Sequence, residues 1–180
     1  MLENVGINPT RDAMLKIMEL MGADIKLENK REQSGEPVAD IHIKSSELCG
    51  INIPKELVPI AIDEFPIIMI AASCAKGETR LSGAAELRVK ESDRIQSMLD
   101  GFIATGIRAE DTEDGMVIQE SKFNGGVVNS HGDHRIAMAF AIAGLVSKET
   151  IVVNDCENVA TSFPGFVELA QKAGVNITYV

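Results

Sequence analysis

The chain has 180 residues, of which 45% are hydrophobic and 4% aromatic, and its formal net charge is -10. A chain of this length hides about 70% of its unfolded surface, which is enough for one sizeable core. The lack of Trp and the negative charge exclude a surface that stacks bases or binds phosphate backbones and anionic membranes. An anionic ligand must therefore be held by a local group of cations.

The cysteines and the apolar stretches narrow the class of protein further. Cys49, Cys74 and Cys156 are isolated and odd in number, which is typical of reduced thiols and predicts a cytoplasmic protein. The apolar stretches Phe65–Ala75 and Ile136–Val146 are shorter than the span of about 18 residues that crosses a membrane. We expect both to be buried helices within a single domain over residues 1–180.

Segments that join a helix to a following strand alternate between two kinds along the chain. In the amphipathic kind, apolar residues recur every three or four positions and a glycine closes the helix. In the other kind, the helix is apolar on nearly every side. The segments are, in chain order, Leu15–Leu27, Phe65–Leu81, Ile95–Ala109, Ile136–Val153 and Phe166–Tyr179. The second and fourth are apolar, and short extra strands are expected near Asp40–Ile43 and Met116–Gln119.

This alternation predicts a repeated unit of helix, strand, loop, helix and strand, present in nearly three copies. Alternating helices and strands favour a layered α/β fold over a helical bundle or a β-sandwich. The apolar helices should be central because they have no polar face, with the amphipathic helices and the sheets outside.

Basic residues stand at the expected helix starts. Lys90 and Arg94 open the helix near Ile95, and Arg135 opens the next one. A cation at this end opposes the helix dipole, at a cost of about 0.3–1 kcal/mol when exposed. A bound anion would offset this cost by using free main-chain N–H groups and the guanidinium forks. The three cations therefore predict a site for a small polyanion.

Plainer interpretations of these residues remain open. Glu91, Asp93 and Asp133 can pair with the cations in ordinary surface salt bridges. Asp63, which precedes an apolar helix, can be a helix cap. His131 and His134 supply only half of a metal-ligand set, so we predict no metal site.

Three motifs resemble signatures of the EPSP synthase (5-enolpyruvylshikimate-3-phosphate synthase) family, in the same order and spacing. Leu87–Arg94 resembles R-V-K-E-(S/T)-D-R, Gly132–Met138 resembles D-H-R-(M/I)-A-M, and Ser162–Pro164 stands where the family has (T/S)-F-P. The resemblance covers essentially the whole chain and implies the EPSP synthase-like fold. It implies that residues 1–180 match the carboxy-terminal half of a two-domain enolpyruvyl transferase. The isolated chain is then expected to be inactive without its amino-terminal domain.

The resemblance implies transfer of the enolpyruvyl group from phosphoenolpyruvate to the 5-hydroxyl of shikimate-3-phosphate, with release of phosphate. This reaction belongs to the shikimate pathway of aromatic amino acid biosynthesis, and the resemblance implies no metal or organic cofactor. By motif position, Asp63 would accept the hydroxyl proton, and Glu91 would deliver and later remove the methylene proton. Lys90 would contact the hydroxyl region, and His134 would steady the surroundings of Glu91.

The remaining roles concern the anionic groups of phosphoenolpyruvate. By the same resemblance, Arg94 and Arg135 would hold its carboxylate. Thr161 stands where many members of the family have a lysine that contacts its phosphate. The form Ala160–Pro164 resembles the family's second sequence class, which includes enzymes tolerant of the inhibitor glyphosate.

Two alternative functions remain. The enolpyruvyl transferase that acts on UDP-N-acetylglucosamine shares the fold but lacks the R-V-K-E-S-D-R form. A non-catalytic module could instead use the anion site for a partner or a regulatory phosphate. Such a module would bind anions equally well after Asp63→Ala and would show no activity with any complementing domain.

Overall fold

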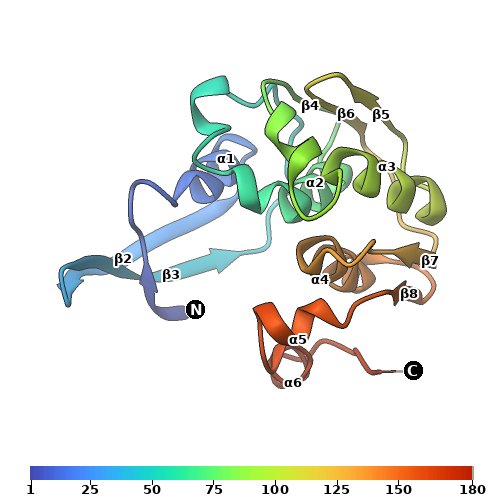
Figure 1. Ribbon diagram of the computed structural model, residues 1–180. Helices are drawn as coiled ribbons and strands as arrows, with labels where there is room; N and C mark the ends of the chain where they lie inside the picture. Colours follow the sequence, from blue (N-terminus) through green and yellow to red (C-terminus); the bar gives the residue numbers. More distant parts are fainter. Residues whose placement is uncertain (180) are drawn as a thin grey trace.

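The computed structural model describes residues 1–179 and alternates helices with strands (Figure 1). The strands are β1 (Leu2–Gly6), β2 (Asp24–Gln33), β3 (Glu36–Lys44), β4 (Glu78–Leu81), β5 (Ala109–Thr112), β6 (Gly115–Gln119), β7 (Gly126–Asn129) and β8 (Ile151–Asn154). The helices are α1 (Ala13–Leu20), α2 (Phe65–Cys74), α3 (Arg94–Thr105), α4 (His134–Ala143), α5 (Asn158–Ser162) and α6 (Phe166–Lys172). Short 3₁₀ turns are η1 (Lys55–Leu57), η2 (Ile62–Glu64), η3 (Ala85–Val89) and η4 (Gly144–Val146).

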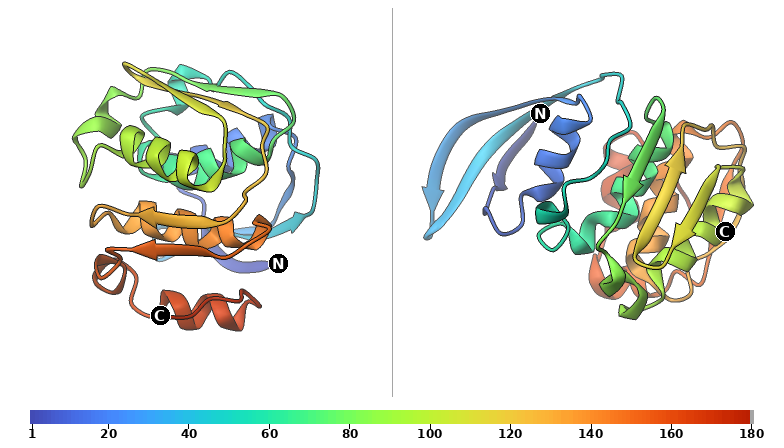
Figure 2. Two further views of the ribbon diagram at one scale, coloured as in Figure 1. Left: turned by 90° about the vertical axis from the view of Figure 1, so that its right-hand side faces the viewer. Right: turned by 90° about the horizontal axis from the view of Figure 1, so that it is seen from above.

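Within the described residues, the strands form three separate sheets around the helices. Two are antiparallel, in the orders β1-β3-β2 and β4-β6-β5, and the third is the parallel pair β7-β8. The β1-β3-β2 sheet projects to one side of the molecule, and the β4-β6-β5 sheet lies on the opposite side (Figures 1 and 2). The β5–β6 hairpin turns tightly at Glu113 and Asp114, because Thr112 pairs with Gly115.

Helices α2 and α4 pack against each other in the centre of the core. Many of their apolar side chains, among them Phe65, Ile68 and Phe140, are fully buried. Helix α3 approaches α4 closely at Gly101, where an added Cβ would lie 2.2 Å from the ring of Phe140. The rings of Phe102 and Phe140 then meet edge to face, with centroids 5.8 Å apart. At the other end of the two helices, Arg94 in the first turn of α3 donates to Asp133, the cap of α4, at 2.8 Å.

The structure confirms the α/β architecture of repeated strand–helix units, with the apolar helices in the centre and the sheets outside. The extra strands expected near Asp40–Ile43 and Met116–Gln119 are β3 and β6. Strands β1 and β7 were not predicted, because each is short and polar or glycine-rich. Their strand state depends on pairing with β3 and β8.

The prediction of a final strand within Phe166–Tyr179 is wrong. After α6, the main-chain N–H of Val175 donates to the carbonyl of Ala170 at 3.0 Å, and Ile177 donates to Val175 at 3.1 Å. The side chain of Gln171 also donates to the carbonyl of Ile177 at 2.7 Å. Residues 175–179 thus bond to each other and to their own helix, and they pair with no strand of the described chain.

The starts of α3 and α4 are fixed by aspartate caps. The carboxylate of Asp93 accepts the N–H of Gln96 at 3.0 Å, and that of Asp133 accepts the N–H of Arg135 at 2.9 Å. The expectation that Lys90 opens α3 is wrong. Lys90 follows η3 and lies in the segment that connects η3 to α3.

Candidate active site

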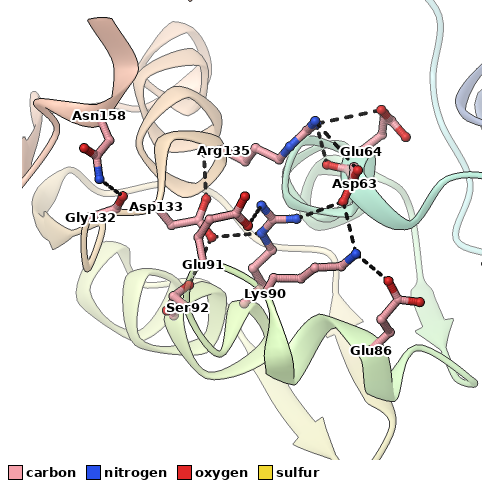
Figure 3. Close-up of polar contacts among 12 residues, drawn as sticks. Asp63, Glu64, Glu86, Lys90, Glu91, Ser92, Gly132, Asp133, Arg135 and Asn158 are labelled. Atoms are coloured by element: carbon pink, nitrogen blue, oxygen red, sulfur yellow. Dashed lines mark hydrogen bonds and ion pairs between the residues drawn. The ribbon is translucent and has the colours of Figure 1, made fainter. Parts of the chain in front are cut away.

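Arg94 is the centre of the site that the sequence predicted. Its side chain is 1% exposed, and every part of its guanidinium meets a carboxylate. Nε donates to Asp133 at 2.8 Å, Nη1 to Asp63 at 3.2 Å and Nη2 to Glu91 at 2.5 Å. Figure 3 shows these carboxylates converging from the start of α4, from η2 and from the η3–α3 segment. One buried arginine therefore joins three distant parts of the chain.

Asp63 is shared by further cations. Its Oδ1 lies 3.5 Å from Nζ of Lys90, and its Oδ2 lies 3.9 Å from Nη2 of Arg135. Arg135 also donates from Nη1 to the main-chain carbonyl of Asp63 at 2.8 Å. The alternative interpretation of Asp63 as a helix cap is wrong, because α2 is preceded by Glu64 and neither side chain caps it. Asp63 instead faces Lys90, Arg94 and Arg135.

Asp133 is fully buried and joins the two helix starts. While Oδ1 caps α4, Oδ2 accepts from Arg94 and, at 3.1 Å, from the hydroxyl of Ser92. Burial acts to raise the pKa of Asp133. The hydrogen bond and charge of Arg94, together with the hydrogen bonds from Arg135 and Ser92, outweigh burial and hold this pKa below its ordinary value. The carboxylate is therefore ionised at neutral pH and stabilises the buried guanidinium.

The pKa values of the more exposed groups follow the same electrostatics. Burial acts to raise the pKa of Asp63, but the charges of Arg135, Lys90 and Arg94 lower it below its ordinary value. The hydrogen bond from Lys90 to Glu86 is the main cause of the raised pKa of Lys90, against partial burial, and the charge of Asp63 adds to it. Asp63 thus stays negative and Lys90 positive at neutral pH.

The three cations of the predicted anion site already have carboxylate partners within the chain. Lys90, Arg94 and Arg135 each meet carboxylates from other parts of the chain. Within residues 1–179, the carboxylates around these three cations outnumber them; they belong to Asp63, Glu64, Glu86, Glu91 and Asp133. The interpretation of these residues as ordinary salt bridges is correct for Glu91 and Asp133, which both pair with Arg94. The pair of Asp133 with Arg94 is buried, however, and not on the surface. Asp93 pairs instead with Arg88, at 2.9 Å.

A cavity of about 500 Å³ adjoins this cluster, within the usual size range of small-molecule sites. It is lined by Glu91, His131, Gly132, His134, Asn158, Thr161 and Ser162. The structure thus brings His134 and Thr161 beside Glu91. Sequence reasoning missed Asn158, whose side chain donates to the carbonyl of Gly132 at 2.5 Å (Figure 3). Asn158 could have been found from its position four residues before the Ser162–Pro164 motif.

Metal-ligand clusters and membrane-spanning helices are both absent from the described residues. Among residues 1–179, no three histidine, cysteine or acidic side chains are grouped in a way that could hold a metal ion. Within the same residues, none of the helices is both long enough and apolar enough to cross a bilayer.

Comparison with known proteins identifies the family. The family model described as EPSP synthase (3-phosphoshikimate 1-carboxyvinyltransferase) matches residues 1–169. The chain belongs to the EPSP synthase family. It is 59% identical over 179 residues to the 3-phosphoshikimate 1-carboxyvinyltransferase of Nitrosococcus oceani, covering 99% of this chain and 40% of that protein. It is also 59% identical over 176 residues to the enzyme of the same name from Methylococcus capsulatus, covering 98% of this chain and 40% of that protein.

Solved structures agree with this assignment. An EPSP synthase from Acinetobacter baumannii superimposes with a TM-score of 0.92 at 55% identity, covering 95% of this chain and 40% of that one. The enolpyruvyl transferase NikO from Streptomyces tendae superimposes with a TM-score of 0.68 at 15% identity, covering 94% of this chain and 36% of that one, which shows a shared fold alone. The chain spans about 40% of the length of the curated relatives it matches.

Proposed function

We propose that this chain is the carboxy-terminal domain of an EPSP synthase and supplies half of its active site. The whole enzyme would transfer the enolpyruvyl group from phosphoenolpyruvate to the 5-hydroxyl of shikimate-3-phosphate in the cytoplasm and release phosphate. The observation that carries the proposal is the convergence of Asp63, the Lys90–Arg94 motif and Arg135 beside one cavity, in a member of this family.

Asp63 is the proposed acceptor of the hydroxyl proton. Its lowered pKa keeps it ionised, which is the state a proton acceptor needs, but a low pKa also makes it a weak base. The anionic groups of the substrates would draw Lys90 and Arg135 away from it. Asp63 then loses two of the three positive charges that lower its pKa, so its basicity rises when the substrates are in place.

Glu91 is the proposed carrier of the methylene proton. Its side chain is half exposed, lines the cavity and accepts a hydrogen bond from the buried Arg94. In the addition step, the substrate hydroxyl oxygen bonds to C2 of phosphoenolpyruvate and C3 takes a proton from Glu91. In the elimination step, Glu91 takes a proton back from C3 while the bond from C2 to the phosphate oxygen breaks. His134, on the same cavity, would steady Glu91.

Arg94 and Arg135 are the proposed contacts of the phosphoenolpyruvate carboxylate, and they are not equally available. Arg135 is 32% exposed and its ion pairs are long, at 3.8 and 3.9 Å. The guanidinium of Arg94 is fully occupied by carboxylates, so a ligand must displace Glu91 or Asp63 from its Nη atoms. The first contact of an incoming anion is therefore Arg135, together with Lys90.

The charge balance of the site supports a need for the amino-terminal domain. Carboxylates outnumber cations around Arg94, so the cluster by itself repels a pair of phosphorylated substrates. Further cations must come from outside this chain, which spans about 40% of its relatives' length. We infer that the isolated chain has no turnover and that the amino-terminal domain restores it.

Reconstitution tests the proposal. The chain is mixed with a separately produced amino-terminal domain, and phosphate release and enolpyruvyl product are measured with shikimate-3-phosphate or UDP-N-acetylglucosamine as acceptor. We expect turnover with shikimate-3-phosphate alone, and its loss with Glu91→Gln. The matched control is Glu19→Gln, because Glu19 is exposed and its side chain forms no hydrogen bond or ion pair within the described residues. Turnover that survives Glu91→Gln, or a folded pair that binds neither substrate, would overturn the proposal.

A further inference from the structure

The segment that carries Lys90 and Glu91 is weakly held by its own backbone. It lies between the end of η3 and the start of α3. Within residues 1–179, the main-chain N–H groups of Glu91 and Ser92 form no hydrogen bond. Side-chain contacts must therefore fix the position of this segment.

Arg88, the residue two places before Lys90, makes the most extensive of these contacts. Its side chain is 26% exposed, and its guanidinium reaches the end of β5 and the turn between β5 and β6. Nε donates to the carbonyl of Glu113 at 2.9 Å, and Nη2 donates to the carbonyl of Thr112 at 2.5 Å and to the carboxylate of Asp111 at 3.2 Å. The fork of fixed N–H groups in arginine suits such a set of acceptors, and lysine cannot reproduce it.

The same guanidinium also holds the far end of the segment. Nη1 of Arg88 donates to Oδ2 of Asp93 at 2.9 Å, while Oδ1 of Asp93 caps α3. The turn that Arg88 grips is itself bound to the chain before η3, because Asp114 accepts the N–H groups of Gly83 and Ala84, each at 2.7 Å. The main chain of Lys90, Glu91 and Ser92 thus lies between two points that Arg88 fixes. The side chains of these residues make their own contacts, with Asp63 and Glu86, with Arg94 and with Asp133 respectively.

We propose that Arg88 is a positioning residue for enolpyruvyl transfer, which sets Lys90 and Glu91 by binding the β5–β6 turn and the cap of α3 together. This role rests on the proposed function. Arg88 does not line the cavity and forms no bond with Asp63, Arg94 or Arg135. It therefore acts through the segment and not on the substrates.

The proposal predicts a separation between catalysis and binding. Arg94 and Arg135 are held by Asp133 and Asp63, independently of Arg88. Loss of Arg88 should leave the binding of the phosphoenolpyruvate carboxylate nearly intact. It should displace the main chain of Glu91, because Arg94 bonds only the carboxylate of this residue. Because a displacement of about 1 Å can cost about 100-fold in rate, kcat should fall by about 10- to 100-fold, with KM for phosphoenolpyruvate within about threefold.

The kinetic test compares Arg88→Ala and Arg88→Lys in the reconstituted pair of domains. Arg88→Lys keeps one donor for the turn and should recover part of kcat. Arg108→Ala is the matched control, since Arg108 is exposed and donates to the carbonyl of Glu120 at 2.7 Å, away from the segment. Equal kcat for Arg88→Ala and Arg108→Ala would overturn the proposal, as would a rise in KM without a fall in kcat.

A second readout, in the full chain without its partner domain, does not depend on turnover. NMR order parameters of the Glu91 and Ser92 amides should fall in Arg88→Ala and less in Arg88→Lys, with the amides of α4 unchanged as a check of folding. Unchanged order parameters at both amides would contradict the claim that Arg88 fixes this segment. If the unsubstituted pair showed no turnover, the proposed function and this role would both fail, whatever the NMR result.

Discussion

Replacing Asp133 with alanine should destabilise the chain by about 4 kcal/mol. Removing one partner of a buried ion pair costs about 3–5 kcal/mol, because the other charge is left buried. Arg94, at 1% exposure, would keep Asp63 and Glu91 as partners, so we take the lower end of this range. Loss of the cap of α4 adds about 1 kcal/mol.

Urea unfolding and thermal melting measure this effect. For a chain of this size, a loss of about 4 kcal/mol lowers Tm by about 8–16 °C. Asp133→Asn keeps the shape and the cap acceptor but loses the charge. Its unfolding free energy should therefore lie between those of the alanine variant and the wild type. The control is Asp100→Ala, since Asp100 is exposed and should cost less than about 0.5 kcal/mol.

The pH dependence of the unfolding free energy tests the contribution of the Asp133 charge. The pKa of Asp133 is lowered in the folded chain, so its contribution to stability is present above the unfolded pKa and is lost as pH falls through the folded pKa. The difference in unfolding free energy between the wild type and Asp133→Asn should therefore shrink in acid. A cost below about 1 kcal/mol for Asp133→Ala at neutral pH would refute the reasoning.

Three further predictions concern the core, the anion contacts and the paired carboxylate. Gly101→Ala places a Cβ 2.2 Å from the ring of Phe140 and should lower the unfolding free energy in urea by about 1–3 kcal/mol. Adding Phe140→Leu should recover part of this loss. An unchanged unfolding free energy would contradict the close approach of α3 and α4. Arg135→Gln removes a charge-assisted hydrogen bond of about 1.5–3 kcal/mol and should raise KM for phosphoenolpyruvate by about 10- to 100-fold in the reconstituted pair, whereas an unchanged KM would exclude Arg135 as a substrate contact. Because the pKa of Asp63 is lowered in the folded chain, the stability difference between wild type and Asp63→Asn should be present at neutral pH and be lost as the pH falls through the folded pKa of Asp63. A difference that grows in acid would contradict the ion pairs of Asp63.

Local patterns predicted much of the fold. The amphipathic helices α1 and α3 and the apolar helices α2 and α4 follow from periodicity, which depends only on neighbouring residues. Strands β1 and β7 do not, because their strand state comes from partners far along the chain. The final segment 175–179 has a strand-like composition but no partner strand in the described chain, so composition gave the wrong prediction there.

In the site, too, local motifs were predicted from the sequence, but contacts between distant segments were not. Motif spacing predicted which cations gather, but it could not show that Asp63 and Asp133 neutralise Arg94 from 31 and 39 residues away. The role of Arg88 was missed for the same reason, because three of its acceptors lie at the end of β5 and in the turn that follows it. Pairing between distant segments depends on the close approach of the helices, which one sequence does not reveal.

The central claim is that η2, the Lys90–Arg94 segment and the start of α4 form one half of a substrate site. Its most direct test is an NMR titration of phosphoenolpyruvate and shikimate-3-phosphate into the isotopically labelled chain, with and without the amino-terminal domain. The account predicts amide shifts at Asp63, Lys90–Arg94 and His134–Arg135, and a marked gain in affinity when the other domain is present. Shifts confined to other surfaces, or no shifts with both domains and both substrates present, would contradict it.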